Sequence, residues 1–318
     1  MSEENANEKA VYALAASPEF ARDGVCFAAR ADGLFRSDDG GASWRSVYDA
    51  LALDAPLPTT SVAVSPAFAF HSDRTVWAGV SGGVLRSTDG GLSWRLGLLP
   101  TPPPLVSALV VSPKYSEDGS VLAGTLEDGV FCSQDRGSQW SAWNFGLLDL
   151  AVLAMSISPD FARDETVFAG TETGVYRSTN GGRAWRETGF PTEAAPVLSL
   201  ALSPTFAVDG SAWAGTESCG VFHTRDRGRS WNRLDGGAVA DAVNALILSP
   251  QFPAQPDALV LQPRSLLVTR DAGRSWSPWT ADTAVEEALT CVAAPQGLDA
   301  GSPLLVGLQN GRVLRAQL

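Results

Sequence analysis

Residues 87–94 of the chain read Ser-Thr-Asp-Gly-Gly-Leu-Ser-Trp, and the pattern Ser/Thr-x-Asp-x-Gly-x-x-Trp recurs along its 318 residues. The copies carry Asp39 and Trp44, Asp89 and Trp94, Asp135 and Trp140, Asp226 and Trp231, Asp271 and Trp276, and, with Asn in place of Asp, Asn180 and Trp185. Successive tryptophans of the pattern stand roughly 45 to 50 residues apart, a period typical of repeat architectures.

A second marker follows the same period: Ser-Pro, with an aromatic residue two positions after the proline. The serines are Ser17, Ser65, Ser112, Ser158, Ser203 and Ser249, and the aromatic residues are Phe20, Phe68, Tyr115, Phe161, Phe206 and Phe252. Ala294-Pro295 takes the place of the marker in a seventh unit. Because two independent markers keep one phase, we interpret the repeats as structural units.

Each unit contains four short segments of strand-like composition, which in the second unit span residues 61–65, 75–80, 83–87 and 93–97. Four strands per unit of this length are typical of a propeller blade. One blade cannot bury both faces of its sheet alone, so neighbouring blades must stack and the ring must close. The sequence therefore predicts an all-β, seven-bladed β-propeller of four-stranded antiparallel blades.

The seven first strands are expected to start near Val11, Ser61, Val106, Leu153, Val197, Val243 and Leu289. After residue 316 the seventh unit contains neither the Asp motif nor a fourth strand, which predicts a three-stranded last blade. We expect residues 1–10 to be a polar tail and residues 11–318 to be a single domain. Its repeats lie near 11–50, 61–100, 106–145, 153–190, 197–235, 243–280 and 288–318.

The Asp motif fits a hairpin turn between the third and fourth strands of a blade. The Asp carboxylate accepts hydrogen bonds from backbone N–H groups of the turn, and Gly supplies the positive φ that other residues resist. The Trp ring is expected to pack beneath its hairpin and hold it to the blade. A structural role is therefore predicted for the six Asp or Asn residues and six tryptophans of the motif.

On these motifs the sequence resembles the Asp-box, or bacterial neuraminidase repeat (BNR-like), superfamily of propellers with a sialidase-like fold. Stretches such as residues 158–162, 167–171 and 174–178 are similar to repeats of bacterial BNR-like proteins, and to photosystem II assembly/stability factor-like and sortilin-like propellers. The resemblance implies the fold; the superfamily also includes sialidases and xyloglucan hydrolases. A shared fold does not transfer a function, which must be argued from a site.

Composition excludes several classes of function. The net charge of −12 without a basic run argues against nucleic acid as a partner. No apolar run approaches the ~20 residues that span a bilayer, and no secretory leader is apparent, so we expect a soluble, cytoplasmic protein without membrane insertion. Cys26, Cys132, Cys219 and Cys291 stand far apart, which predicts reduced thiols. No metal and no cofactor are expected.

Catalytic motifs are also missing from the sequence. It contains neither the Arg-Ile-Pro of sialidases nor a Gly-x-Ser-x-Gly nucleophile motif, and His71 and His223 occupy unlike positions in their units. A glycosidase needs two carboxylates ~5 to 9.5 Å apart. Candidates lie in the turns between second and third strands, on the face opposite the Asp-motif hairpins. They are Asp32, Glu127, Asp128, Glu172 and Glu217.

The charges are predicted to divide between the two faces of the ring. The connections between blades lie on the same face as the candidate acids and contribute further acids. These are Asp49, Asp54, Asp149, Glu187, Glu193, Asp235, Asp241, Asp282, Glu286 and Glu287. The hairpin side carries Arg136, Arg183, Arg225, Arg227, Arg229, Arg270 and Arg274. An acidic face steers cationic partners toward the channel mouth, although the same charge also keeps a protein soluble.

We predict from this asymmetry a non-catalytic interaction scaffold that binds a protein or peptide, basic by charge complementarity, through the five candidate acids and the channel rim. A carbohydrate-active propeller, either glycoside hydrolase or lectin-like with a glycan as partner, is the first alternative. An assembly factor for a membrane or redox complex is the second. The sequence leaves the oligomeric state and the ligand open.

Overall fold

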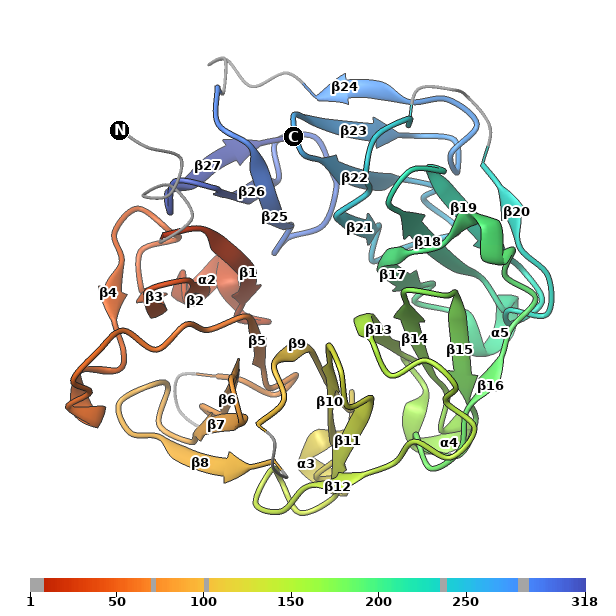
Figure 1. The fold of residues 1–318 in the computed structure, drawn as a ribbon. Coiled ribbons are helices and arrows are strands. Elements are labelled where there is room, and N and C mark those ends of the chain that lie inside the picture. Colours follow the sequence, from red (N-terminus) through yellow and green to blue (C-terminus); the bar gives the residue numbers. More distant parts are fainter. Residues whose placement is uncertain (1–8, 70–72, 100–102, 235–238, 280–285) are drawn as a thin grey trace.

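In the computed structural model, seven antiparallel sheets follow one another around a central axis (Figure 1). The structure describes residues 9–69, 73–99, 103–234, 239–279 and 286–318. Six sheets have four strands in sequential order and the last has three, which confirms the predicted seven-bladed β-propeller. The predicted tail lies mostly outside the described residues. In the described part of the chain no helix is long and apolar enough to cross a membrane.

The strands are given blade by blade, from the channel outward. The first two blades contain β1 (Val11–Ala16), β2 (Cys26–Arg30), β3 (Gly33–Ser37) and β4 (Arg45–Ser46), then β5 (Ser61–Val64), β6 (Val76–Val80), β7 (Gly83–Ser87) and β8 (Arg95–Leu98). The third and fourth contain β9 (Val106–Val111), β10 (Val121–Thr125), β11 (Val130–Ser133) and β12 (Ser141–Ala142), then β13 (Val152–Ile157), β14 (Val167–Thr171), β15 (Val175–Ser178) and β16 (Arg186–Glu187).

The last three blades follow the same order. They contain β17 (Val197–Leu202), β18 (Ala212–Thr216), β19 (Val221–Thr224) and β20 (Asn232–Arg233), then β21 (Ala245–Leu248), β22 (Ala258–Gln262), β23 (Ser265–Thr269) and β24 (Ser277–Trp279), and finally β25 (Leu289–Ala293), β26 (Pro303–Leu308) and β27 (Val313–Gln317). The predicted first strands therefore shift at two blades. The fourth blade begins at Val152 rather than Leu153, and the sixth at Ala245 rather than Val243.

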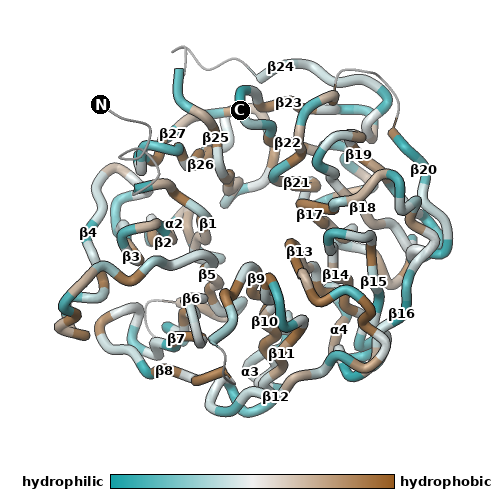
Figure 2. Tube along the Cα trace, in the orientation of Figure 1, coloured by the Kyte–Doolittle hydropathy of each residue, from teal (hydrophilic) through white to brown (hydrophobic). Residues whose placement is uncertain are grey.

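Burial explains why these segments form strands. Every residue of β6, β10, β14, β18 and β22 is buried, because a neighbouring blade covers each face of its sheet. Figure 2 shows the same gradient: apolar residues concentrate along the inner strands β13 and β17, and polar residues along the outer strand β20. The core is therefore divided among the interfaces between blades.

A glycine near the end of the second strand repeatedly makes room for a valine of the next blade. The pairs are Gly79 with Val106, Gly124 with Val152, Gly170 with Val197, Gly215 with Val243, and Gly307 with Val11. A Cβ placed on any of these glycines would lie within 3.0 Å of a valine methyl group. The Gly307–Val11 pair joins the seventh blade to the first, so it closes the ring.

Backbone hydrogen bonds distinguish the two faces. On one face, the turn between second and third strands contacts the preceding blade connection, as in the bond from Leu126 N to Leu105 O at 3.1 Å. On the other face, the Asp-motif hairpin contacts the connection between first and second strands, as in the bond from Arg136 N to Gly119 O at 3.0 Å. We call these the rim face and the hairpin face.

The Ser-Pro marker forms a compact loop on the hairpin face. In four blades it leads into one helical turn, namely α2 (Phe20–Asp23), α3 (Tyr115–Asp118), α4 (Phe161–Asp164) and α5 (Phe206–Asp209). The marker serine donates to an Asp at the end of the turn, as Ser17 does to Asp23 at 2.7 Å. Ser112, Ser158 and Ser203 donate in the same way to Asp118, Asp164 and Asp209. These four aspartates form a second set of repeated acids that was not among the predicted site residues.

Candidate functional site

The Asp-motif hairpins use their carboxylates within the turn. Asp89 Oδ1 accepts hydrogen bonds from the N–H groups of Leu92 (3.0 Å) and Ser93 (2.9 Å), and from Ser87 Oγ (2.7 Å). Asp89 Oδ2 accepts one from Ser93 Oγ at 2.6 Å. Asp39, Asp135, Asp226 and Asp271 accept comparable bonds, and Asn180 Oδ1 accepts from Ser178 Oγ and Ala184 N. The motif acids are thus committed to holding the turns.

These hydrogen bonds favour the ionised carboxylates. Bonds from the hydroxyl and N–H of Ser275 and from the Thr269 hydroxyl lower the pKa of Asp271 to about 2. Desolvation opposes the shift at Asp226, but bonds from Ser230 and Thr224 still lower its pKa to about 2. The unfolded chain therefore binds more protons than the folded chain in the acidic range.

We expect acid to destabilise the fold through these hairpins. A carboxyl whose folded pKa is depressed contributes stability above its unfolded pKa of about 4 and loses it as the pH falls toward about 2. Urea unfolding measured across this window should give a free energy of unfolding that becomes smaller as the pH is lowered. The Asp226→Asn, Asp271→Asn double variant should decline less steeply, because Asn180 shows that an amide accepts similar bonds. An unchanged slope would contradict the assignment.

The tryptophans of the motif also reach the preceding blade, a contact that the prediction of a ring packed beneath its hairpin did not include. Trp94 Nε1 donates to Val47 O in the first blade at 2.9 Å, and Trp185 Nε1 donates to Trp143 O in the third blade at 2.8 Å. Trp231 Nε1 likewise donates to Thr188 Oγ1 at 3.1 Å. The hairpin projects toward the neighbour, so the large ring fills the junction between two blades.

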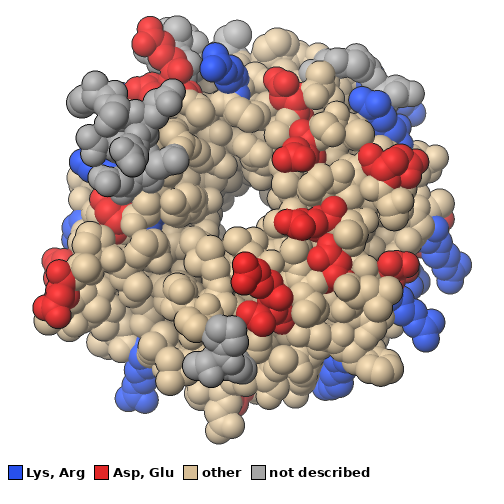
Figure 3. Space-filling view, in the orientation of Figure 1, with Lys and Arg blue, Asp and Glu red and all other residues tan. Residues whose placement is uncertain are grey.

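The candidate acids lie where the turns between second and third strands reach the rim face. Glu127 and Asp128 lie in the β10–β11 turn, Glu172 in the β14–β15 turn and Glu217 in the β18–β19 turn, on three consecutive blades. Glu127, Glu172 and Glu217 are exposed and Asp128 is half-buried. Figure 3 shows acidic residues gathered along one arc of the central opening.

Asp32 does not belong to this arc. Asp32 lies on the first blade. The second blade, which separates it from the arc, has no acid in its corresponding turn, Ser81–Gly82. Arg30 Nη2 donates to Asp32 Oδ2 at 2.9 Å, and the same guanidinium lies 4.1 Å from the centre of the Phe35 ring. Because its charge is neutralised by this pair, Asp32 contributes little to the potential of the rim face.

The ion pairs of the described residues concentrate on the hairpin face. There Glu19, Asp38, Glu117, Asp160, Glu165 and Asp257 each pair with an arginine or lysine. On the rim face the structure contains only the Arg30–Asp32 pair among the described residues. Glu127, Asp128, Glu172 and Glu217 form no ion pair there, so the arc keeps an uncompensated negative charge.

Asp149 adds a fixed acid to the arc. It lies in the connection between the third and fourth blades, where Oδ2 accepts bonds from Thr173 N (2.9 Å) and Thr173 Oγ1 (2.8 Å). Desolvation alone would raise its pKa, but bonds from Ala151 and Thr173 hold the pKa below its ordinary value. Asp149 therefore stays ionised while it ties the connection to the turn that carries Glu172. Asp149 was predicted to lie on this face, but its bonds to Thr173 were not predicted.

The remaining acids, histidines and cysteines add no metal-binding group to the described part of the chain. Asp235, Asp282 and His71 lie outside the described residues. Burial, with a smaller effect of Arg225, lowers the pKa of His223. Burial also raises the pKa of Cys26, Cys132 and Cys291 to about 12. No group of three or more His, Cys, Asp or Glu in the described chain has a metal-binding geometry.

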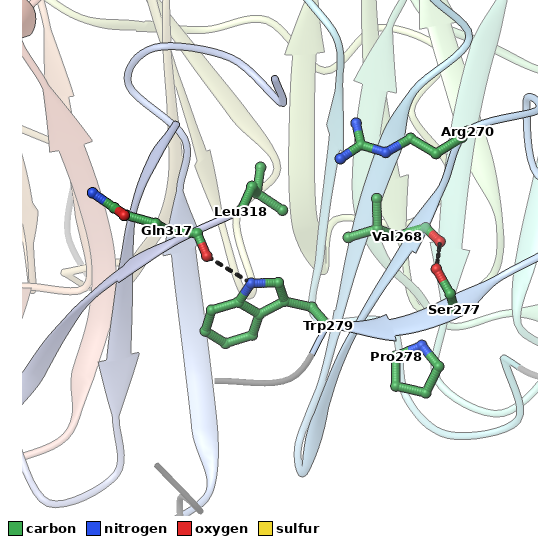
Figure 4. Close-up of a pocket in the computed structure, with 7 residues that line it drawn as sticks. All are labelled: Val268, Arg270, Ser277, Pro278, Trp279, Gln317 and Leu318. Atoms are coloured by element: carbon green, nitrogen blue, oxygen red, sulfur yellow. Dashed lines mark hydrogen bonds between the residues drawn. The ribbon is translucent and has the colours of Figure 1, made fainter. Parts of the chain in front are cut away.

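A groove of about 310 Å³ lies between the sixth and seventh blades (Figure 4). Val268, Arg270 and Trp279 approach from the sixth blade, and Gln317 and Leu318 from the end of the chain. The Trp279 indole Nε1 donates to Gln317 O at 2.9 Å and thereby joins the two blades beside the missing fourth strand. The groove is open and is lined by both polar and apolar side chains, of which only Arg270 is titratable.

Comparison with known proteins supports the fold. Neither a protein-family model nor a curated protein matches the sequence. Among solved structures, YCF48 bound to D1 peptide aligns with a TM-score of 0.69 and 17% identity over 98% of this chain and 94% of its own. The GH74 xyloglucanase from Xanthomonas campestris aligns with a TM-score of 0.73 and 19% identity, over 96% and 51%.

The extracellular domain of BT4673 from B. thetaiotaomicron aligns with a TM-score of 0.70 and 14% identity over 98% of this chain. The chain spans 38% of that protein's length and about half of the xyloglucanase. These similar structures are seven-bladed β-propellers. At such low identity the likeness establishes the shared fold alone.

Proposed function

We propose that this chain is a non-catalytic interaction scaffold whose rim face binds an extended, basic segment of a protein. The observation that carries the proposal is the arc of Glu127, Asp128, Glu172 and Glu217, which form no ion pair among the described residues, whereas six acids of the hairpin face each pair with an arginine or lysine. Uncompensated charge around a low-dielectric opening concentrates field and steers cationic partners. The peptide bound to YCF48 is compatible with such a use of the fold.

Charge reversal tests the proposal directly. We expect the combined Glu127→Lys, Asp128→Lys, Glu172→Lys, Glu217→Lys variant to bind a fluorescent Lys-rich peptide about tenfold more weakly or worse, measured by anisotropy at low salt. A matched control reverses the hairpin-face acids Glu19, Glu117, Asp160 and Glu165 and changes the net charge equally. Loss of binding in both variants, or in neither, would contradict a site on the rim face.

Two alternatives remain distinct in their predictions. The similarity to the GH74 xyloglucanase favours a carbohydrate-active protein, either hydrolase or lectin-like, and blank results on a glycan array and on aryl glycosides would remove it. The similarity to YCF48 favours an assembly factor for a membrane or redox complex, which co-purification with such a complex would support.

We further propose that the chain belongs to the Asp-box, or BNR-like, superfamily, that residues 11–318 form one domain and that the protein is cytoplasmic. The repeated hairpin hydrogen bonds support the first proposal, and the packing of the first blade against the seventh supports the second. A single cooperative unfolding transition is the expected result for one domain.

A further inference from the structure

Three arginines converge on a cavity at the junction of the fourth and fifth blades, on the hairpin face. The cavity has a volume of about 250 Å³. Its lining includes Arg177 from β15, Arg227 and Arg229 from the hairpin after β19, the exposed Thr179, and Phe206 of α5. Such a concentration of positive charge is notable in a protein whose net charge is −12. We call it the arginine pocket.

Two of the three guanidinium groups are held in place by backbone carbonyls. Arg177 Nη1 donates to Arg227 O, and Arg227 Nη2 donates to Ala207 O at 2.6 Å. Each carbonyl takes up one N–H group, so the remaining donors of both side chains are available to a ligand. The Arg229 guanidinium forms no hydrogen bond or ion pair among the described residues, whereas its backbone bonds to Asp226.

Two nearby carboxylates keep their negative charge, but neutral donors rather than the arginines hold them. Asp164 also lines the pocket, but it accepts hydrogen bonds from Ser158 Oγ (2.7 Å) and Thr166 N (2.9 Å). Asp226 is bound by Ser230 and Thr224 in its hairpin. Burial lowers the pKa of Arg177, and the charges of Arg229 and Arg227 lower it further, while the Asp226 carboxylate opposes the shift. The three cations therefore repel one another, and an anion between them would relieve that repulsion.

The junction of the second and third blades provides an internal comparison. There Arg86 Nη1 donates to Arg136 O, as Arg177 does to Arg227 O. Asp73, Thr75 and Thr88 occupy the positions of Asp164, Thr166 and Thr179 in the repeat. Three lining positions differ: Ser138 replaces Arg229, Ser116 replaces Ala207, and Tyr115, whose hydroxyl interacts with Arg86, replaces Phe206.

The comparison separates a structural role from a binding role. The paired arginines recur at both junctions and tie a hairpin to the neighbouring blade, so they account for packing. Arg229 is extra: it adds a third charge at one junction, where Phe206 also leaves Arg177 without the hydroxyl that engages Arg86. The additional arginine therefore has no packing function that the second junction requires.

We propose that the arginine pocket binds the dianionic group of a phosphate monoester or of inorganic phosphate. Guanidinium groups form charge-assisted, bidentate hydrogen bonds with phosphate oxygens, and three of them around one cavity match a tetrahedral dianion better than a planar carboxylate. The hydroxyl of Thr179 adds a neutral donor. The site lies on the face opposite the acidic arc and stands independently of the scaffold proposal.

Isothermal titration calorimetry of the full chain tests the site with inorganic phosphate, O-phosphothreonine and threonine as probes. We expect saturable binding of the first two and none of threonine. Arg229→Ser, which introduces the residue that the second junction has at this position, should weaken binding about tenfold or more through loss of a charged donor. Tighter binding of phosphothreonine would identify a phosphorylated side chain as ligand, and equal binding the free ion; either supports the site.

A gain-of-function variant complements the loss. Ser138 is exposed, and Ser138→Arg should create a second, weaker phosphate site at the junction of the second and third blades, seen as binding retained in the Arg229→Ser background. Thermal melting shows whether both variants keep the fold. Binding of phosphate unchanged by Arg229→Ser, absence of binding by the native chain, or equal binding of threonine would each overturn the proposal.

Discussion

Replacement of Trp185 by alanine should lower the free energy of unfolding by about 3 to 5 kcal/mol, the range measured for large buried aromatic residues. The side chain is only 2% exposed and packs with Leu122 and Leu147 of the third blade and its connection. Its indole also donates to Trp143 O. Removing the ring would leave a cavity between two blades that their separate hydrogen-bond ladders cannot close. Urea unfolding followed by fluorescence measures the loss.

Two companion variants separate packing from the hydrogen bond. Trp185→Phe keeps most of the apolar surface and should cost mainly the lost indole bond, on the order of 1 kcal/mol. Val208→Ala removes a side chain that is 87% exposed and should change stability by less than about 0.5 kcal/mol. If Trp185→Ala cost no more than Val208→Ala, the ring would not hold neighbouring blades together.

Gly307→Ala should destabilise the protein by about 1 to 3 kcal/mol through overpacking. A Cβ at this position would lie 2.4 Å from Cys291 Sγ and 2.9 Å from Val11 Cβ, in the contact that joins the last blade to the first. The backbone there is extended, so the cost would come from crowding rather than from strained φ. Chemical unfolding of the variant provides the measurement.

A double-mutant cycle identifies the crowded neighbour. Val11→Ala alone removes buried methyl groups and should also destabilise the fold. Combined with Gly307→Ala, it should recover part of the loss, because the two side chains compete for one volume, and the coupling should exceed about 0.5 kcal/mol. Strict additivity would show that Gly307 does not meet Val11 at ring closure.

The spacing of the Asp motif and of the Ser-Pro marker was sufficient to predict the number of blades, the three-stranded seventh blade and the position of the hairpins. These features depend on local turn chemistry that recurs in every unit. The bond between Ser17 and Asp23 corresponds to a regular feature of the sequence, a serine followed six residues later by an aspartate. The same spacing follows Ser112, Ser158 and Ser203. Serine and aspartate at this spacing are compatible with many turns, so the spacing alone does not identify the bond.

Features that depend on contacts between blades could not be predicted. The register of one blade against the next decides that Trp185 reaches Trp143 rather than its own sheet. The turn geometry around Asp32 decides that Arg30 neutralises it, whereas Glu172 keeps its charge. The arginine pocket likewise needs residues of two blades, since Arg177 and Arg229 are distant in the sequence.

The three-stranded seventh blade has a consequence for self-association. The outer edge of β27 presents unpaired backbone groups among the described residues, and such an edge can recruit another polypeptide as an added strand. Arg312 is exposed just before β27 and Arg315 is exposed within it. The Trp279 indole donates a hydrogen bond to Gln317 O, so this carbonyl is not available to another strand. Two copies meeting edge to edge would bring their arginines together, so the same residues that border the open sheet protect the protein from polymerising through it.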